Sequence, residues 1–315
     1  MTLTEQIKSK ALELGFHKVG IAKAELLTPE GEQLQEWLRR GYHATMQWMN
    51  KSVEKRIDPR EVVAGAQSVI SVAVNYYTPI QHSSNLLEGK ISRYAWGDDY
   101  HILVTKRIQM LFECIKQMAP DAQGRYYVDT GPVMDKVWAA RAGIGWQGKH
   151  TNLITKEYGS WVFLGEIITT LTLEYDSPME DYCGTCTACI DACPTEAIRK
   201  PYIVDSNRCL SYLTIEHRGE IEARFHDKFE NWIYGCDICQ DVCPWNRFQQ
   251  PTEHKEFYPR EWNVSVNPEE LTTISQEEFS KRYKDSPIKR TKVDGLRRNA
   301  TIVAKNILEK QRSIE

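Results

Sequence analysis

The chain of 315 residues contains a run of four closely spaced cysteines that ends in a proline. The run has the spacing C-x2-C-x2-C-x3-C-P and comprises Cys183, Cys186, Cys189, Cys193 and Pro194. Four thiolates this close together cannot pair as unstrained disulfides, but they suit the corners of a cubane iron–sulfur cluster. The run therefore predicts a 4Fe-4S site wrapped by loops and short helices, whatever surrounds it.

A second run, Cys236, Cys239, Cys243 and Pro244, lacks only the opening cysteine of the first. Cys209, between the two runs, is the obvious substitute. In bacterial two-cluster ferredoxins the fourth cysteine of a run ligates the other cluster. The spacing thus predicts two crossed sets of ligands: Cys183, Cys186, Cys189 and Cys243 for the first, and Cys193, Cys209, Cys236 and Cys239 for the second.

A pair of structural zinc sites is the alternative, since zinc also uses C-x2-C pairs. Zinc needs neither a third closely spaced cysteine nor a trailing proline, so we favour two clusters. Two adjacent clusters carry single electrons. The cysteines therefore predict electron transfer, without saying what the electrons reduce.

Length and composition limit the remaining possibilities. The chain is long enough for one large or two ordinary domains. Nine cysteines and an N-terminus without a secretory signal favour a reducing compartment, the cytoplasm. No apolar stretch reaches the ~18 residues of a membrane span, so we expect no membrane association.

The net charge of −3 argues neither for nor against a polyanionic partner. Residues 281–298, however, are strongly basic, with only Asp285 and Asp294 as opposing acids. A solvated helical face is the simpler account, and a phosphate-contacting patch is the alternative. The residues proposed for such a patch are Lys281, Lys289, Arg290, Lys292, Arg297 and Arg298.

Helix and strand patterns alternate in the first half of the chain. Helices are predicted at 3–14, 28–41, 98–118 and 133–142, and strands at 17–23, 67–76, 125–129 and 160–169. A final helix is expected at 294–311, with Asp294 as its N-cap. This mixture predicts an α+β fold in layers. We expect a catalytic α/β domain at 1–175, a ferredoxin-like domain at 176–250 and a helical segment at 251–315.

One stretch before the cysteines has the character of an active site. Asp129 lies where a strand pattern runs into a turn, and a carboxyl group there is a plausible general acid if desolvation keeps it protonated near neutral pH. Three glycines at 143–148 let the backbone approach a flat or anionic ligand. They follow a helix pattern, so they are a weak dinucleotide signal. Lys149 and His150 could bind phosphate or an amide-rich ligand, or form an ordinary loop.

Six motifs together closely resemble those of the epoxyqueuosine reductase family: CGTCTACIDACP, CDICQDVCPWN, VDTGPVMDK, ARAGIGWQGKH, RIDPREVVAGAQSVI and SRYAWGDDYH. The resemblance covers the chain to about residue 300. It implies reduction of epoxyqueuosine to queuosine at the tRNA wobble position, with Co(I) cobalamin as the reactive centre and two 4Fe-4S clusters. It also implies a nitroreductase-like cobalamin-binding core related to reductive dehalogenases, and a start of a HEAT-like repeat at 295–300.

The same resemblance implies roles for individual residues. Asp129 would be the proton donor. No D-x-H-x-x-G motif is present, because Val104 replaces the glycine after Asp99-Tyr100-His101. Cobalamin is therefore expected base-off, with no protein histidine on cobalt. The candidate corrin contacts are Arg56, Ser92, His101, Asp129, Lys149, His150, Asn152 and Ser211.

Two other classes of function remain open. A reductive dehalogenase-like enzyme for small organohalides is one, although those enzymes are usually exported and no export signal is present. A simple electron carrier is the other, although it would not need the large domain that precedes the cysteines. The expected partners are the anticodon loop of tRNA and an external low-potential electron donor, and the chain is expected to be a monomer.

Overall fold

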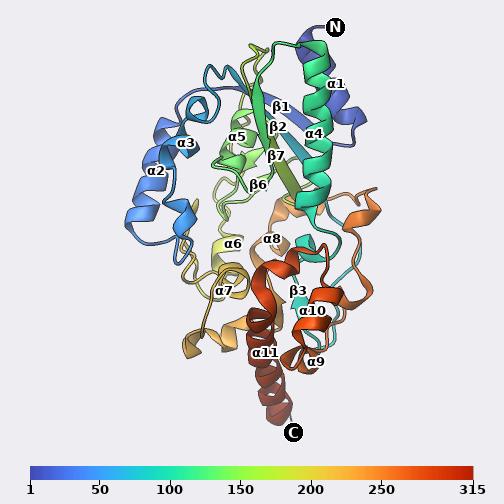
Figure 1. The fold of residues 1–315 in the computed structure, drawn as a ribbon. Helices are drawn as coiled ribbons and strands as arrows, with labels where there is room; N and C mark the ends of the chain where they lie inside the picture. The colour runs from blue at the N-terminus through green and yellow to red at the C-terminus, as the bar shows by residue number, and fades with distance from the viewer. Residues whose placement is uncertain (315) are drawn as a thin grey trace.

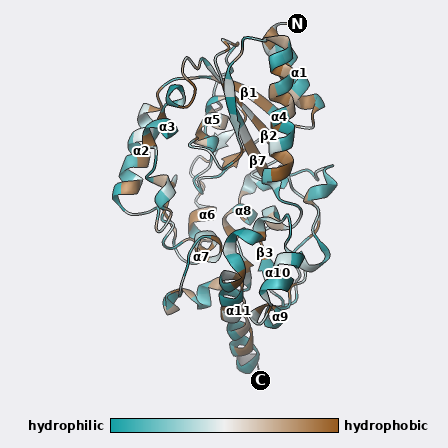
Figure 2. Ribbon diagram, in the orientation of Figure 1, coloured by the Kyte–Doolittle hydropathy of each residue, from teal (hydrophilic) through white to brown (hydrophobic). Residues whose placement is uncertain are grey.

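The computed structural model describes residues 1–314. Its N-terminal half, at the top of Figure 1, is built on a four-stranded antiparallel sheet. The strands lie in the order β1 (Lys18–Lys23), β2 (Ser68–Asn75), β7 (Val162–Thr169) and β4 (Gly124–Tyr127). Every residue of β2 is buried, because both faces of the sheet are covered. Figure 2 shows the hydrophobic character of these strands.

Helices cover the two faces of this sheet (Figure 1). α1 (Leu3–Glu13) and α4 (Tyr100–Met118) pack on one face, and α5 (Asp135–Arg141) packs on the other. α4 forms its contact through residues spaced at helical intervals, including Val104, Ile108 and Leu111. α2 (Thr28–Arg39) and α3 (Val53–Ile57) lie beyond α5. The result is a layered α/β unit.

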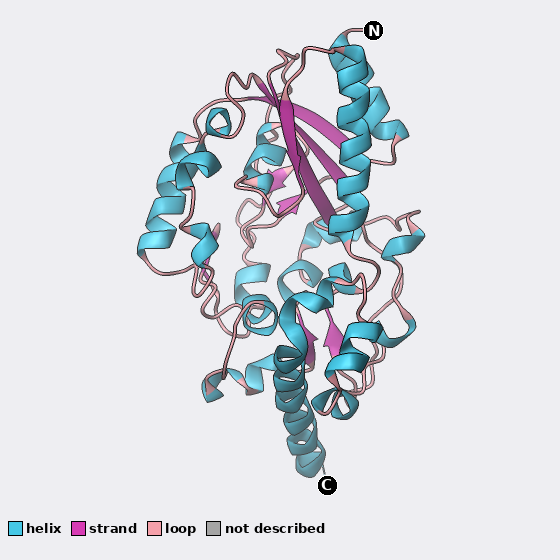
Figure 3. Cartoon of the chain, in the orientation of Figure 1, coloured by secondary structure: helices cyan, strands magenta, loops and turns pink. Residues whose placement is uncertain are grey.

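The C-terminal half consists of short elements joined by long loops, as Figure 3 shows. Three short helices, α6 (Ala188–Asp191), α7 (Leu210–Ile215) and α8 (Ile238–Asp241), accompany the cysteines. β5 (Trp146–Gln147) and β6 (Leu153–Ile154) form a short hairpin before β7, and β8 (Ile198–Lys200) and β9 (Ile203–Val204) form another in the C-terminal half. The chain then forms α9 (Pro268–Thr272), α10 (Gln276–Arg282) and the long α11 (Lys292–Ile314).

One hydrophobic core holds this second half together. It joins residues from three distant stretches of the chain, among them Trp96, Tyr234 and Leu296. β3 (Lys90–Ile91) pairs in parallel with β10 (Trp232–Tyr234), and α11 packs against β10 and α9. Residues of β3 and the segment after it, such as Trp96, thus share one core with α11, and the three consecutive domain ranges expected from the sequence stay a prediction.

The expected helices and strands of the first half are present, with ends shifted by a few residues. The expected N-cap at Asp294 is wrong, because α11 begins at Lys292. Within residues 1–314, no helix is long and apolar enough to cross a membrane.

Candidate active site between the sheet and the cysteine loops

A cavity of about 550 Å³ lies where the end of the sheet meets the cysteine loops. Tyr76, Asp129 and Phe163 line it from the sheet side. The opposite wall is made by the second predicted set of cluster ligands, Cys193, Cys209, Cys236 and Cys239. A molecule in this cavity would therefore touch a cluster site and Asp129 together.

The structure brings the two cysteine runs side by side, since α6 of the first run packs against α8 of the second. Burial, and then the thiols of Cys243 and of the first two cysteines of its own run, raise the pKa of Cys189 to about 11. Burial, and then the thiols of Cys209 and Cys193, hold the pKa of Cys239 well above its usual range. The fourth cysteine of each run thus lies beside the other run.

Lys149 supports the first cysteine loop from within. Its buried Nζ donates to the carbonyl oxygens of Gly184 at 2.6 Å and Cys186 at 2.9 Å. Lys149 is not among the described residues that line the cavity. Its ammonium group thus holds the loop, and a corrin contact by Lys149 stays a prediction.

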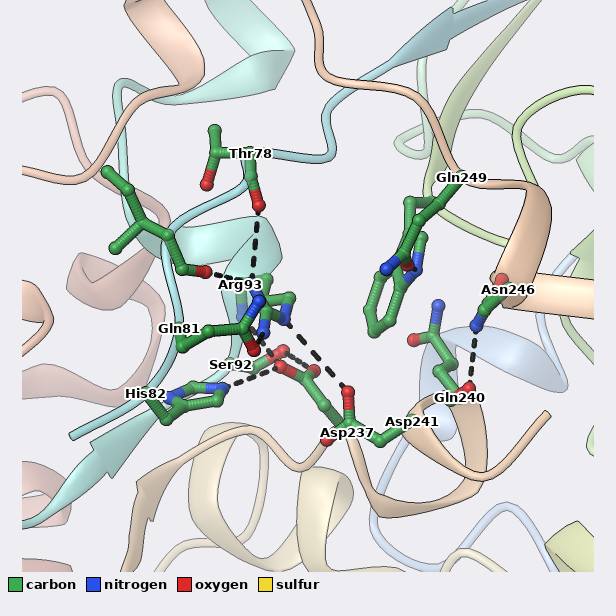
Figure 4. A network of polar contacts seen from close by, with 12 residues as sticks. Thr78, Gln81, His82, Ser92, Arg93, Asp237, Gln240, Asp241, Asn246 and Gln249 are labelled. Carbon is green, nitrogen blue, oxygen red and sulfur yellow. Dashed lines mark hydrogen bonds and ion pairs between the residues drawn. The ribbon is translucent and has the colours of Figure 1, made fainter. Parts of the chain in front are cut away.

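A buried polar network supports the second loop (Figure 4). Asp237, between two cysteines, accepts hydrogen bonds from Ser92 Oγ and, at 2.8 Å, from the backbone N–H of Arg93. His82 Nε2 lies 3.4 Å from the same carboxyl group. The Arg93 guanidinium lies over the Trp96 ring, 4.8 Å from its centroid. Ser92 lines the cavity as expected, but its hydroxyl is engaged with Asp237.

Asp129 has a left-handed backbone, with φ of 57°, in the loop after β4. Tyr100, the first residue of α4, donates its hydroxyl to Asp129 Oδ2 at 2.9 Å. His101 Nε2 lies 3.3 Å from the same oxygen, and its Nδ1 lies 2.8 Å from Asp99 Oδ1. The Tyr100 ring stacks on Phe163 of β7, with centroids 4.2 Å apart. The start of α4 thereby fixes the carboxyl group.

In the pair formed by Asp129 and His101, the proton lies on His101. Burial raises the pKa of Asp129, but the hydrogen bond and charge of His101 outweigh it and lower that pKa to about 2. Burial lowers the pKa of His101, but Asp129 and Asp99 raise it to about 9. These shifts favour a carboxylate on Asp129 and an imidazolium on His101. The expectation that Asp129 is the proton donor stays a prediction; Asp129 lines the cavity, whereas His101 is not among its described lining residues.

His150 presents an unused donor to the cavity. Its Nδ1 accepts from the backbone N–H of Asn152 at 3.1 Å, so the ring proton lies on Nε2. That Nε2 is buried and has no hydrogen-bond partner in the described part of the chain. Burial lowers the pKa of His150 to about 4, so the ring is neutral at neutral pH. His150 therefore offers a neutral N–H to an acceptor in the cavity.

The other residues expected to contact the corrin differ in whether they line the cavity. Asn152 and Ser211 line the cavity. Arg56 is not among its described lining residues; it donates to the carbonyl oxygen of Trp48 at 3.2 Å and faces Asp135. A direct corrin contact by Arg56 stays a prediction.

The basic residues proposed at 281–298 fall into two groups, one engaged by the backbone and one exposed. Arg297 donates to the carbonyl oxygen of Ile274, and Arg298 donates to three backbone carbonyl groups near residues 213–219. Burial lowers the pKa of Arg298 to about 10. These hydrogen bonds tie both guanidinium groups to the fold, and a contact of Arg297 or Arg298 with tRNA stays a prediction. The four residues left exposed are Lys281, Lys289, Arg290 and Lys292.

Arg290 connects this surface to the cavity. Its Nε donates to Glu216 at 2.8 Å, and Glu216 lines the cavity. The guanidinium also lies over the Trp48 ring, 5.1 Å from its centroid. Lys289 and Lys292 flank it in sequence, so this part of the basic stretch lies near the cavity mouth.

The sequence analysis did not identify three residues: Asp99, Tyr100 and Glu166. Asp99 and Tyr100 could have been found, because they stand beside His101 in the SRYAWGDDYH segment. No sequence pattern marks Glu166, which lies within an apolar strand pattern and has a fully buried side chain.

The chain matches two family models. One, described as "Epoxyqueuosine reductase QueG, DUF1730", matches residues 56–130, and one described as "4Fe-4S double cluster binding domain" matches residues 182–246. The second match supports the interpretation of the cysteine runs as a double-cluster domain.

Comparisons over the whole chain point to the same family as the family models do. An epoxyqueuosine reductase of Leadbetterella byssophila is 49% identical over 302 residues, covering 95% of this chain and 98% of that protein. One of Synechocystis is 51% identical over 271 residues, covering 85% and 93%. A crystal structure of epoxyqueuosine reductase with an epoxyqueuosine-modified tRNA-Tyr stem loop is 32% identical with a TM-score of 0.91, covering 97% and 81%. The chain belongs to the epoxyqueuosine reductase family.

Proposed function

We propose that this protein reduces epoxyqueuosine to queuosine in tRNA. The observation that carries the proposal is the single cavity with Asp129 on one wall and a set of cluster-binding cysteines on the other. The family supports the substrate, and a solved relative holds an epoxyqueuosine-modified tRNA stem loop. The cavity supports the chemistry, because electrons and protons would reach one bound molecule from opposite sides.

The reaction sets the requirements. Both C–O bonds of the epoxide break, a C=C bond forms and the oxygen leaves as water, which consumes two electrons and two protons. Clusters carry electrons one at a time. Cobalamin bound in the cavity would supply the strongly reducing centre that delivers two electrons to carbon. The chain itself must hold that cofactor, exclude water and provide protons.

The cavity wall suits an amide-rich ligand. The unpartnered Nε2–H of His150 is placed to donate to an amide carbonyl group, with Asn152 and Ser211 beside it. Because His150 accepts at Nδ1 and is protonated at Nε2, it offers no lone pair to a metal. This supports a cobalamin without His150 as a ligand to cobalt; the base-off state is proposed from the family resemblance.

The cluster ligands are proposed as the two crossed sets. The second set lines the cavity, whereas Cys186 of the first set is exposed. An external low-potential donor would therefore pass electrons to the first cluster, and the second cluster would pass them into the cavity. The direction follows from exposure at one end and the cavity at the other.

The His101–Asp129 pair is the proposed source of the proton for the departing oxygen. Asp129 faces the cavity, and His101 behind it carries the proton at neutral pH. As negative charge develops on the oxygen, the proton moves from His101 Nε2 through the Asp129 carboxyl group to that oxygen. General acid catalysis of this kind typically contributes 10²–10⁴-fold.

The tRNA would approach from the exposed basic residues near Arg290. Bases of an anticodon loop are unpaired, so extruding one into the cavity costs little. Lys and Arg would contact the flanking phosphates with little reading of sequence. We also propose, as finer points, a cytoplasmic monomer, a nitroreductase-like kinship for the α/β unit and α11 as the first helix of a HEAT-like repeat.

Mass spectrometry of a tRNA stem loop tests the proposal. Protein with reconstituted clusters, cobalamin and a chemical reductant should convert epoxyqueuosine in the RNA to queuosine, with loss of one oxygen. Omission of cobalamin should abolish conversion. Unchanged epoxyqueuosine with fully loaded protein would refute the proposal, and dehalogenation of a small organohalide under the same conditions would favour the dehalogenase alternative.

A further inference from the structure

Glu166 is a charged side chain buried in the middle of β7. It is 0% exposed, and in the described residues no N–H or hydroxyl group donates to its carboxyl oxygens; its side-chain hydrogen-bond partner is the Asp135 carboxyl group. In the sheet it lies opposite Ser71 of β2, whose buried hydroxyl has no hydrogen-bond partner in the described residues. On β7, Glu166 alternates with Leu164 and Ile168, which pack toward α5. Its carboxyl group therefore points to the side of the sheet where α5 begins.

α5 begins with Asp135, which lines the cavity. α5 packs against β7, and the Asp135 and Glu166 carboxyl groups lie within side-chain hydrogen-bond reach of each other. Burial, and then the charge of Asp135, hold the pKa of Glu166 well above its usual range. Burial raises the pKa of Asp135; the hydrogen bond with Glu166 opposes that rise, and the charge of Asp129 adds to it. Two adjacent carboxylates in a buried site do not both ionise, so such a pair retains one proton.

The charges around the pair do not replace that proton. Asp129 adds negative charge, while Lys136 and Arg56 are the basic groups that face it. Neither forms an ion pair with Asp135 or Glu166 in the part of the chain that the structure describes. On the β4 side the neighbour in register is Tyr127.

We propose that Asp135 and Glu166 share one proton and deliver it, at Asp135, as the second proton of the reaction. The inference rests on the proposed function. The reaction consumes two protons, and His101–Asp129 holds one. In the second transfer an O–H bond of the acid pair breaks, the proton joins the departing oxygen to complete water, and the pair is left with one more negative charge. That charge is unfavourable in a buried site, so the pair then takes up a proton from solvent.

Infrared spectroscopy tests the shared proton without substrate. Wild-type protein at neutral pH should show a carboxylic-acid C=O band that shifts in D2O, and Glu166→Gln should remove it. Glu157→Gln, which changes an exposed carboxyl group paired with Lys18, should leave the band in place. A band that is absent from the wild type, or that survives in Glu166→Gln, would overturn the proposal.

The pH profile of turnover tests delivery. Glutamine preserves the size of Glu166 but holds no acid proton, so the variant must take its second proton from water. Its rate relative to wild type should fall by up to about tenfold for each pH unit above neutrality. A merely structural role predicts the same ratio at every pH, and that result would refute delivery. A wild-type protein that shows the band but does not convert epoxyqueuosine would refute the proposed function alone.

Discussion

Replacing Asp129 with asparagine removes one of the two carboxylates that hold a proton on His101. The structure places His101 Nε2 at 3.3 Å from Asp129 and Nδ1 at 2.8 Å from Asp99, and the pKa of His101 is about 9. An opposite charge within ~4–6 Å typically shifts a pKa by 1–3 units. With Asp99 still present, we expect the pKa of His101 to fall by roughly 1–2 units in Asp129→Asn.

The shifted pKa values of His101 and Asp129 set the direction in which stability and turnover change with pH. The folded-state pKa of His101 lies above its ordinary value of 6.5, so its stabilising ion pairs are fully present below pH 6.5 and are lost as the pH rises through about 9. The pKa of Asp129 is lowered from 3.8 to about 2, so its contribution is lost as the pH falls through that value. Turnover should therefore decline as the pH approaches 9, when His101 loses its proton.

Nuclear magnetic resonance titration of the histidine ring signals, with the clusters oxidised, measures this pKa directly. The signals of His217 and His226, whose rings contact backbone carbonyl groups, should not change in Asp129→Asn. Turnover should fall by about 10²–10⁴-fold while iron and cobalamin remain bound. An unchanged pKa of His101 would refute the ion pair, and near-normal turnover would remove Asp129 from the mechanism.

Two further predictions concern the clusters and the RNA. Cys193→Ser and Cys243→Ser should each damage the cluster made mostly by the other run; iron analysis with electron paramagnetic resonance decides, and damage confined to the home run contradicts the crossed sets. A variant with glutamate in place of Lys289, Arg290 and Lys292 should bind tRNA more weakly, and the salt dependence of its binding should fall by about one unit of slope for each lost contact. The control variant is Lys305→Glu. Unchanged tRNA affinity across a salt series would contradict a role of these three residues in tRNA binding.

Local signals in the sequence were reliable where the structure is local. The sequence patterns at 67–76 and 98–118 predicted the strand β2 and the helix α4, because each pattern reflects the packing of one continuous segment. The spacing of the first cysteine run was informative because its cysteines are close together in the chain. The pairing of β3 with β10 was not predictable in this way, since it joins segments far apart in the chain.

The site residues show the same limit. Lys149 stands beside His150 in sequence, yet one faces the cysteine loop and the other faces the cavity. The sequence predicted that the basic side chain of Arg298 contacts phosphate, but in the fold it donates hydrogen bonds to backbone carbonyl groups. The ionisation of Asp129 depends on His101, which is supplied by another element. Side-chain direction and charge coupling arise only in the folded chain.

The central claim is that one cavity joins a cluster to the reacting centre. Electron paramagnetic resonance of protein loaded with cobalamin in the paramagnetic Co(II) state tests it most directly. Because the second cysteine set lines the cavity, reduction of that cluster should broaden or split the cobalt signal through magnetic coupling. A cobalt signal that stays the same when the cluster is reduced would contradict the account.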